Sequence, residues 1–308
     1  MATMITRLND IISLIDTMAL GQPRVVAAYL VSGKERALVD MGFESSAPRL
    51  IKDLADAGVE DGDLDYLLPT HVHMDHAGSC GTLARKFSKA SVLVHPKGEP
   101  HLADPTRLCK GVTELFGVEQ MERMGSPKPV SKKQLAAIGD DQIINLGKSV
   151  TLRSMWTPGH ASHHLSYLIE ATSTVLTGDA IGTNYPGFPV LIPTTPPTSF
   201  NLPLALNSIE RIRQIAPREF LAPHFGVMSR CEELLDANVS ALREWRSKIE
   251  ERIKEGRTAG AIAKELEFVM TERCRLPISS IPDYVTGSIS RSVLGFMKYL
   301  QAGQIIQN

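Results

Sequence analysis

Short apolar runs separated by turn residues dominate the chain up to residue 222. Runs of this length that are rich in β-branched residues are typical of buried β-strands. The first expected strands are Ile11–Ile15, Val25–Ser32 and Ala37–Val39, and Gly33-Lys34 would join the last two as a hairpin. This part of the chain is therefore expected to be built around β-sheet. Further strands are expected at residues 65–68, 91–95, 142–146, 150–156, 165–169, 174–177 and 219–221.

Helical spacing of apolar residues appears between some of these strands and takes over near the C-terminus. The pattern of Ser46–Ala57 is amphipathic and stops at Gly58, as expected where a glycine ends a helix. Residues 229–308 carry only helical patterns, separated by Gly256 and by the Pro277–Pro282 stretch. We therefore expect a helical appendage there, which would serve in dimerisation or frame the mouth of a substrate site. The helices expected along the chain are 46–57, 77–89, 202–215, 231–254, 258–266 and 284–300.

A different pattern interrupts the strands between residues 104 and 140. Leu108–Met124 has apolar residues at helical spacing, among them Phe116 and Met121, and Ser126-Pro127-Lys128-Pro129 ends it. This segment is a candidate lid insertion over a binding site, because Met and Phe form adaptable apolar walls. The alternative, that its apolar face packs on the main body, is equally favoured.

The composition is that of a globular protein without a charge bias. The chain has 308 residues, of which 43% are hydrophobic and 22% charged, and its formal net charge is −1. We therefore expect no nucleic-acid partner, because binding to phosphate backbones requires a basic field. No apolar run approaches the roughly 20 residues that cross a bilayer, so no membrane association is expected. The length is sufficient for one main domain with an appendage.

The start of the chain and the cysteines indicate a cytoplasmic protein. Residues 1–7 lack the charged and apolar segments of a secretory signal. The four cysteines have no CxxC spacing and are expected to be reduced thiols. Cys80 lies near the candidate metal residues described next and is either a ligand or nucleophile, or a small apolar residue in a helix, which is favoured.

Three histidines and one carboxylate fall within the six residues His71-Val72-His73-Met74-Asp75-His76. They follow the strand-like run that ends at Leu68, so they lie where α/β sheets place their ligands. His71 and His73 would point to one side of an extended chain, whereas Asp75 and His76 require a turn. Imidazole and carboxylate at this density indicate a zinc or iron site rather than ordinary surface histidines.

The His-x-His-x-Asp-His stretch resembles the signature of the metallo-β-lactamase-fold hydrolases. The resemblance covers about residues 10–228 and implies a four-layer αββα sandwich, with a catalytic domain at 1–228 and the appendage at 229–308. It also implies three further ligands, each after a strand-like run: His160, Asp179 and His224. One metal ion would then be held by His71, His73 and His160, and the other by Asp75, His76 and His224, with Asp179 as the bridge.

The resemblance assigns supporting roles to three more residues. Asp40 would hydrogen-bond around the metal site, since metal-bound histidines need an outer acceptor, although a plain turn residue is the alternative. His164 would support the ligands from a buried position. Tyr185 is either a hydrogen-bond donor to a developing oxyanion or, favoured, an aromatic anchor of its loop. His95 and His101 lie outside the metal positions of the family.

The implied function is that of a stand-alone metal-dependent hydrolase similar to glyoxalase II or the lactonases. Two divalent ions, with zinc favoured over iron or manganese, would hold a shared hydroxide that attacks a lactone, thioester, phosphoester or β-lactam. Asp75 and Asp179 would be the catalytic carboxylates, and the partner would be a small-molecule substrate, with a homodimer left open. The alternative is a mononuclear iron oxidoreductase similar to the sulfur dioxygenases of the same superfamily. A regulatory protein with a vestigial site is disfavoured, because no ligand is missing.

Overall fold

The computed structural model describes residues 4–305, which divide into two compact units. The sheet unit comprises Met1–Trp156, His163–Gly178 and Arg218–Met228. The helical unit comprises Thr157–Ser162, Asp179–Pro217 and Ser229–Asn308. This division groups two further stretches, 157–162 and 179–217, with the C-terminal helices that we expected at 229–308.

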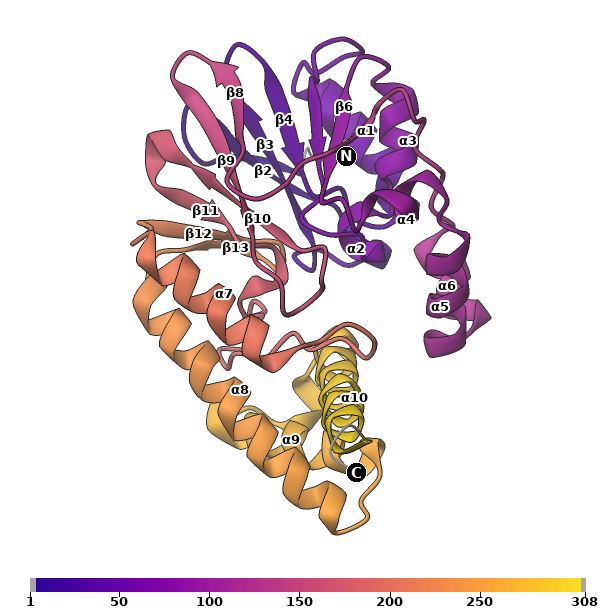
Figure 1. The fold of residues 1–308 in the computed structure, drawn as a ribbon, viewed down its shortest axis with the longest axis vertical. Helices are drawn as coiled ribbons and strands as arrows, with labels where there is room; N and C mark the ends of the chain where they lie inside the picture. The colour runs from indigo at the N-terminus through magenta and orange to yellow at the C-terminus, as the bar shows by residue number, and fades with distance from the viewer. Residues whose placement is uncertain (1–3, 306–308) are drawn as a thin grey trace. The chain divides into compact units, whose positions relative to one another are not determined.

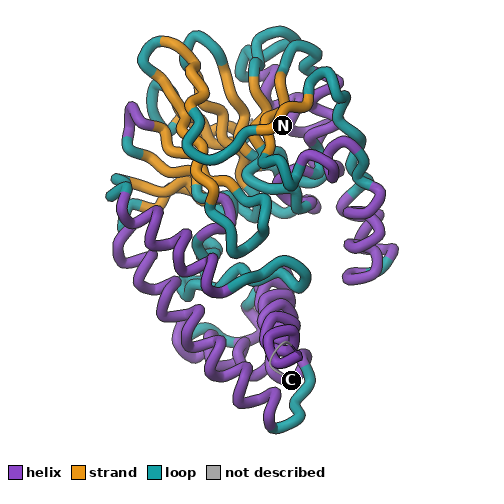
Figure 2. Tube along the Cα trace, in the orientation of Figure 1, coloured by secondary structure: helices purple, strands orange, loops and turns teal. Residues whose placement is uncertain are grey.

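The sheet unit contains two sheets, and Figure 2 shows that the strands gather in this unit. The first sheet has the order β1-β2-β3-β4-β5-β6-β7, antiparallel up to β4 and parallel from β4 to β7. The second has the order β13-β12-β11-β10-β9-β8 and is antiparallel except for the parallel pair β11 and β12. The strands are β1 Ile5–Arg7, β2 Ile12–Asp16, β3 Ala27–Ser32, β4 Arg36–Val39, β5 Tyr66–Leu68, β6 Ser91–Val94, β7 Leu135–Ala137, β8 Ile143–Gly147, β9 Val150–Trp156, β10 Leu165–Ile169, β11 Thr174–Leu176, β12 Glu219–Ala222 and β13 Gly226–Met228.

Alternation of side chains along the strands produces two cores in this unit. One core joins the two sheets and contains Tyr29 and Tyr167, which are 2% and 0% exposed. The Tyr29 hydroxyl donates to the Ala222 carbonyl at 2.6 Å, so the first sheet is tied to the end of β12. The other core lies between the first sheet and helices α1 and α3, with Leu50 and Phe87 at its centre. The helices of this unit are α1 Ala47–Asp56, α2 Met74–Ala77, α3 Cys80–Lys86, α4 Glu99–Ala103, α5 Thr106–Phe116 and α6 Val118–Met124.

Parallel pairing brings the carboxyl ends of several strands to the same edges, where the candidate site residues follow. Asp40 follows β4, and the stretch from Thr70 to His76 follows β5, which is the parallel neighbour of β4. In the second sheet, His224 follows β12. The strands therefore place these side chains at sheet edges, as open α/β sheets do with their ligands.

The helical unit is built from four long helices and the loop between Asp179 and Asn201 (Figure 1). Helix α7 packs on α8, and α8 and α9 both pack on α10. The Thr258 side chain caps α9 and the Asn201 side chain caps α7, as expected for helix N-termini. Within the described residues 4–305, no helix is long and apolar enough to cross a membrane. The helices are α7 Leu202–Gln214, α8 Cys231–Lys254, α9 Ala259–Cys274 and α10 Asp283–Ile305.

Three of the expected helices differ from the structure. The helix expected over 77–89 is shorter, because α2 ends at Ala77 and α3 covers only Cys80–Lys86; the ψ of 2° at Ser79 separates the two. The stripe at Leu108–Met124 is also broken, at Gly117, whose φ of 85° a helix does not allow. The helix expected over 258–266 continues to Cys274, since Met270 and Thr271 are buried and no breaker precedes Arg275.

Candidate metal centre

The stretch that follows β5 changes conformation at His73. Thr70, His71 and His73 precede a helical turn, α2, for which His73 is the N-cap with a φ of −66° and a ψ of 157°. Asp75 and His76 lie inside that turn. The first two histidines therefore point from extended chain, and the next two ligand candidates point from a helix. This is the turn that the alternation of side chains requires.

The ring nitrogens of His71 and His73 face each other. His71 Nε2 lies 2.9 Å from His73 Nδ1, and the other His71 nitrogen, Nδ1, lies 3.1 Å from the Thr70 hydroxyl. His71 is fully buried. A metal ion is bound by one imidazole nitrogen while the other nitrogen is held by a neighbour. The His71 ring has this arrangement, with Thr70 as the neighbour of Nδ1 and Nε2 as the candidate metal-binding atom.

The buried Asp40 carboxylate holds two residues of the stretch after β5, Thr70 and His76. Asp40 is 2% exposed and has a φ of 54°, a left-handed conformation that Asp and Asn tolerate better than other residues. Its Oδ1 accepts from the Thr70 backbone N–H at 2.8 Å, and its Oδ2 lies 2.9 Å from His76 Nδ1. The Thr70 hydroxyl also donates to this carboxylate. Asp40 therefore fixes the His76 ring with Nδ1 inward and Nε2 toward the ligand candidates.

Asp75, His76 and His224 form a group of donor atoms within 4.8 Å of one another. The Asp75 carboxylate lies 3.8 Å from His76 Nε2 and 3.6 Å from His224 Nε2. The opposite nitrogen of His224, Nδ1, donates to the Val25 carbonyl at 3.0 Å. Both histidines are thus oriented by inner hydrogen bonds, and both Nε2 atoms face one carboxylate.

His164 lies beneath this loop. Its ring is fully buried, with its centroid 5.0 Å from that of His71. Gly178 leaves room for it, because a Cβ there would come within 2.5 Å of His164 Nε2. The Leu165 backbone N–H donates to the Thr70 carbonyl at 2.7 Å, which ties the start of β10 to residues 70–76, here called the ligand loop.

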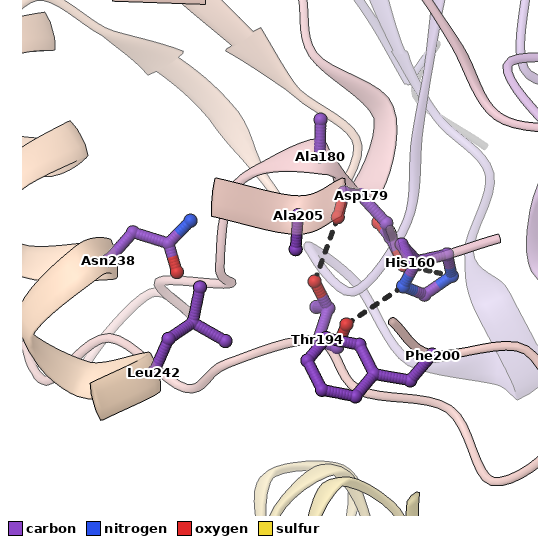
Figure 3. Close-up of a pocket in the computed structure, with 8 residues that line it drawn as sticks. All are labelled: His160, Asp179, Ala180, Thr194, Phe200, Ala205, Asn238 and Leu242. Atoms are coloured by element: carbon purple, nitrogen blue, oxygen red, sulfur yellow. Dashed lines mark hydrogen bonds and ion pairs between the residues drawn. The ribbon is translucent and has the colours of Figure 1, made fainter. Parts of the chain in front are cut away.

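His160 and Asp179 form a pair within the helical unit (Figure 3). His160 Nε2 lies 3.4 Å from the Asp179 Oδ2, and each residue is 6% exposed. His160 Nδ1 donates to the Thr194 carbonyl at 3.0 Å, and the Thr194 hydroxyl donates to the Asp179 backbone carbonyl at 2.9 Å. One loop residue therefore holds both partners of the pair.

The turn before His160 depends on Gly159. Its φ is 136°, and a Cβ at this position would overlap the Ala205 backbone at the start of α7. The Asn201 backbone N–H donates to the Gly159 carbonyl at 2.8 Å, and the Ser208 hydroxyl donates to the Pro158 carbonyl at 2.6 Å. The sequence Pro158-Gly159-His160 thus orients the imidazole because α7 holds the turn.

A small pocket adjoins the His160–Asp179 pair. The centre of a water molecule can occupy a volume of about 10 Å³ in it, so the pocket holds about one water. Figure 3 shows the Asn238 and Leu242 side chains of α8 across the pocket from the pair. The residues that line it are His160, Asp179, Ala180, Thr194, Phe200, Ala205, Asn238 and Leu242.

Three histidines of the sheet unit outside the donor candidates, His95, His101 and His163, have a lowered pKa. Burial and the neighbouring His73 and His101 lower the pKa of His163 to about 3. Burial, followed by nearby Arg107, lowers the pKa of His101. Burial and Lys97 likewise lower the pKa of His95, whose ring stacks on Trp156 at 5.7 Å.

Two other residues singled out in the sequence lie in packed surroundings. Cys80 is fully buried in the core beneath the first sheet, where burial raises the pKa of its thiol to about 12. This environment suits the favoured interpretation of Cys80 as a small apolar residue. Tyr185 is 4% exposed, and its ring packs edge-on against Tyr284 at 5.2 Å, as expected for an aromatic anchor of its loop.

Sequence reasoning assigned no role to three residues that orient the ligand candidates. Thr70 was visible only as the neighbour of His71, and its side chain contacts both His71 and Asp40. Thr194 lies in a proline-rich loop with no local signal for its contacts. Val25 acts through its backbone carbonyl, which carries no sequence signal at all.

The donor set of the sheet unit fits divalent metal ions on the geometry of its side chains. Imidazole nitrogen and carboxylate oxygen are the donors that zinc and iron accept in proteins. His71, His76 and His224 each have one nitrogen held by a fixed neighbour, which leaves the other nitrogen on the ligand side. Hydrogen bonds of this kind fix the tautomer of metal-binding histidines.

Comparison with known proteins supports the same interpretation. The family model of the metallo-beta-lactamase superfamily matches residues 21–224. A metallo-beta-lactamase fold-containing protein of Sulfurisphaera tokodaii is 28% identical over 211 residues, which are 67% of this chain and 75% of that protein. A probable metallo-hydrolase of Methanocaldococcus jannaschii is 28% identical over 154 residues, which are 50% of this chain and 66% of that protein.

A solved structure shares the fold. The crystal structure of an archaeal metallo-beta-lactamase superfamily protein from Sulfolobus tokodaii superimposes with a TM-score of 0.64, over 91% of this chain and 94% of that chain, at 22% identity. The expected αββα fold with added C-terminal helices is therefore confirmed. Because the family model matches residues 21–224, which are more than half of the chain, this chain belongs to the metallo-beta-lactamase superfamily.

Proposed function

We propose that this protein is a metal-dependent hydrolase that cleaves an ester-type bond in a small molecule. The observation that carries the proposal is the convergence of His76 and His224 on Asp75, each ring being oriented by a hydrogen bond from its other nitrogen. A structural histidine cluster has no need to direct both Nε2 atoms at one carboxylate in this way, whereas a metal site does. A relative in Methanocaldococcus jannaschii bears the name of a probable metallo-hydrolase.

We assign the donors to two ions. His71, His73 and His160 would hold one ion, Asp75, His76 and His224 the other, and Asp179 would bridge them. The assignment is supported by the order of the seven residues in the sequence, all within the matched residues 21–224. Zinc is favoured, because the set combines imidazole nitrogen with carboxylate oxygen.

Divalent ions in such a site supply a water of lowered pKa and a Lewis acid for the scissile carbonyl or phosphoryl group. The residues of the chain provide the rest. The Asp75 side chain keeps 30% of its surface exposed, so one oxygen can accept a proton from the attacking water and return it to the leaving group. Asp40 and Thr70 keep the histidine rings in place during this transfer. The thiol of Cys80 is not needed as a nucleophile.

Metal analysis combined with a substrate panel tests the proposal. Protein purified without chelator should bind two ions per chain and hydrolyse at least one lactone, thioester or phosphoester. His224→Ala should lose one ion and most of the activity, whereas His95→Ala, outside the donor set, should keep both. A stoichiometry of one that His224→Ala leaves unchanged would contradict the two-ion assignment.

The same experiment distinguishes the proposed function from the rival class. A mononuclear iron oxidoreductase would contain one iron per chain, consume dioxygen with a persulfide substrate and hydrolyse none of the panel. The group of two histidines and one carboxylate in the sheet unit has the composition that non-haem iron also accepts. Hydrolysis by the zinc-loaded protein would support the proposed function and contradict the rival.

A further inference from the structure

Helix α10 contacts the backbone of the residue next to Thr194, and Thr194 holds the His160–Asp179 pair. The Thr195 side chain is 1% exposed, and its hydroxyl donates to the Ser292 carbonyl of α10 at 2.7 Å. Three residues further along the helix, a Cβ at Gly295 would overlap the Thr195 carbonyl oxygen. The helix and the loop therefore meet backbone to backbone, which only a glycine at position 295 allows.

A second contact joins α10 to the same surroundings. Phe296 is fully buried, and its ring lies 4.9 Å from that of Phe200. Phe200 lines the small pocket beside His160 and Asp179 (Figure 3). Consecutive residues of α10, Gly295 and Phe296, thus contact both the loop and the aromatic residue beside the pair.

We propose that α10 positions the metal-binding pair through Thr195 and Thr194, so that Gly295 and Thr195 set the affinity of the site for its ions. This inference rests on the proposed function, in which His160 and Asp179 are ligands. The physical argument is the short path from helix to pair. A shift of the Thr195 backbone moves the adjacent Thr194 carbonyl, which accepts from His160 Nδ1, and the Thr194 hydroxyl, which donates to the Asp179 carbonyl.

The expected size follows from the role of such supporting contacts. Removing a group that orients a metal ligand typically lowers metal affinity about 10-fold to 100-fold. Because Gly295 acts through two intervening residues, we expect about a 10-fold loss of zinc affinity for Gly295→Ala. Packing alone would lower stability and leave the affinity of the folded protein unchanged.

Gly295→Ala has a matched control on the same helix. A Cβ at Gly287 would meet only the flexible Arg291 guanidinium, at 3.1 Å, so Gly287→Ala changes helix propensity equally without touching the loop. If Gly295→Ala fails to fold, Thr195→Val provides the second variant, because it removes the hydroxyl bonded to Ser292 at nearly constant volume. Thr195→Ser keeps that hydroxyl and should retain the affinity of the natural protein.

Zinc affinity is measured by chelator competition on the full chain, and the His160 ring is followed by 15N NMR in the metal-free protein. Gly295→Ala and Thr195→Val should weaken zinc binding and shift the His160 ring signals, whereas Gly287→Ala and Thr195→Ser should change neither. Unchanged affinity and unchanged ring signals in the folded Gly295→Ala or Thr195→Val variant would overturn the inference. If the natural protein binds no zinc, iron or manganese, the proposed function fails, while shifted ring signals would still show that α10 positions His160.

Discussion

Asp40→Asn is the sharpest test of the buried support beneath the ligand loop. Asparagine has the shape of aspartate and tolerates the φ of 54° at this position, so the backbone should remain in place. The Thr70 N–H can still donate to the amide oxygen, in place of Oδ1. The amide NH2 then replaces Oδ2, 2.9 Å from His76 Nδ1. Two donors would face each other there, so His76 must move its proton to Nε2, the nitrogen that we assign to the metal.

The expected effect is a loss of metal affinity together with a loss of stability of similar size. Outer-support variants lower metal affinity about 10-fold to 100-fold, which is about 1.4 to 2.8 kcal/mol. Loss of a hydrogen bond to a charged group removes about 1.5 to 3 kcal/mol from the free energy of unfolding of the metal-free protein. Chelator competition measures the first quantity and urea unfolding of the metal-free protein measures the second.

Asp16→Asn is the matched control. Asp16 is 6% exposed, and its two oxygens accept from the backbone N–H groups of Met18 and Arg24 at 3.0 and 2.8 Å. It is therefore another buried carboxylate at a strand end, but it has no contact with a ligand candidate. Both variants should unfold at lower urea concentration, and only Asp40→Asn should bind metal more weakly. Equal metal affinity in the two folded variants would refute the role assigned to Asp40.

Three further predictions concern the rest of the chain. Phe116→Ala in the expected lid should raise KM for large acyl substrates without changing metal content. Met121 is 7% exposed, so Met121→Ala should mainly lower the thermal midpoint. An unchanged KM in Phe116→Ala would favour the packing alternative. Cys80 should resist thiol reagents in the native protein, because burial raises its pKa to about 12, and mass spectrometry after native alkylation measures this directly. The hydrogen bond from Arg273 lowers the pKa of Glu244 to about 2. The ion pair should therefore contribute fully to the free energy of unfolding above the unfolded pKa of about 4.3, and this contribution should be lost as pH falls toward 2. In urea unfolding, Glu244→Gln should lower the free energy of unfolding by about 1 kcal/mol at neutral pH and leave it nearly unchanged near pH 2.

The architecture was predictable because its signals are local. Apolar β-branched runs located the long strands of both sheets, and the register of β3 with β4 confirms the hairpin expected at Gly33-Lys34. The missed strands β1, β7 and β13 have three residues each, too few to show an alternating pattern. Helix ends at Gly117 and Arg275 were missed because they depend on backbone conformation and tertiary packing.

The candidate site was predictable to the extent that it consists of side chains with a distinctive spacing. The stretch from His71 to His76 is recognisable without any structure, and the geometry of Asp40 beneath it follows from its place at the end of β4. Thr194 and Gly295 were not predictable, because their importance comes from contacts with residues far away in the chain. A threonine in a loop and a glycine in a helix have too many ordinary explanations for the sequence alone to assign them.

Asp179→Asn tests the carboxylate that we assign as the bridge. The side-chain oxygen at 3.4 Å from His160 Nε2 would become either an amide oxygen or an amide nitrogen, and the negative charge would be lost. The backbone should hold, because Thr194 donates to the Asp179 main-chain carbonyl and not to its side chain. Without the charge, the repulsion between two nearby cations is no longer offset, so both should bind more weakly.

We therefore expect Asp179→Asn to lower kcat at neutral pH by at least about 100-fold, with added zinc restoring only part of it. The pH at which kcat reaches half its maximum should also rise, because a water near fewer or more distant cations has a higher pKa. Ser162→Ala, on the exposed turn just after His160, should change neither quantity. Hydrolysis is measured against pH, with metal content determined on the same samples. Metal content and rate equal to those of the natural protein would show that the bridge is a different residue, because a bridging carboxylate cannot lose its charge without weakening the binding of both ions.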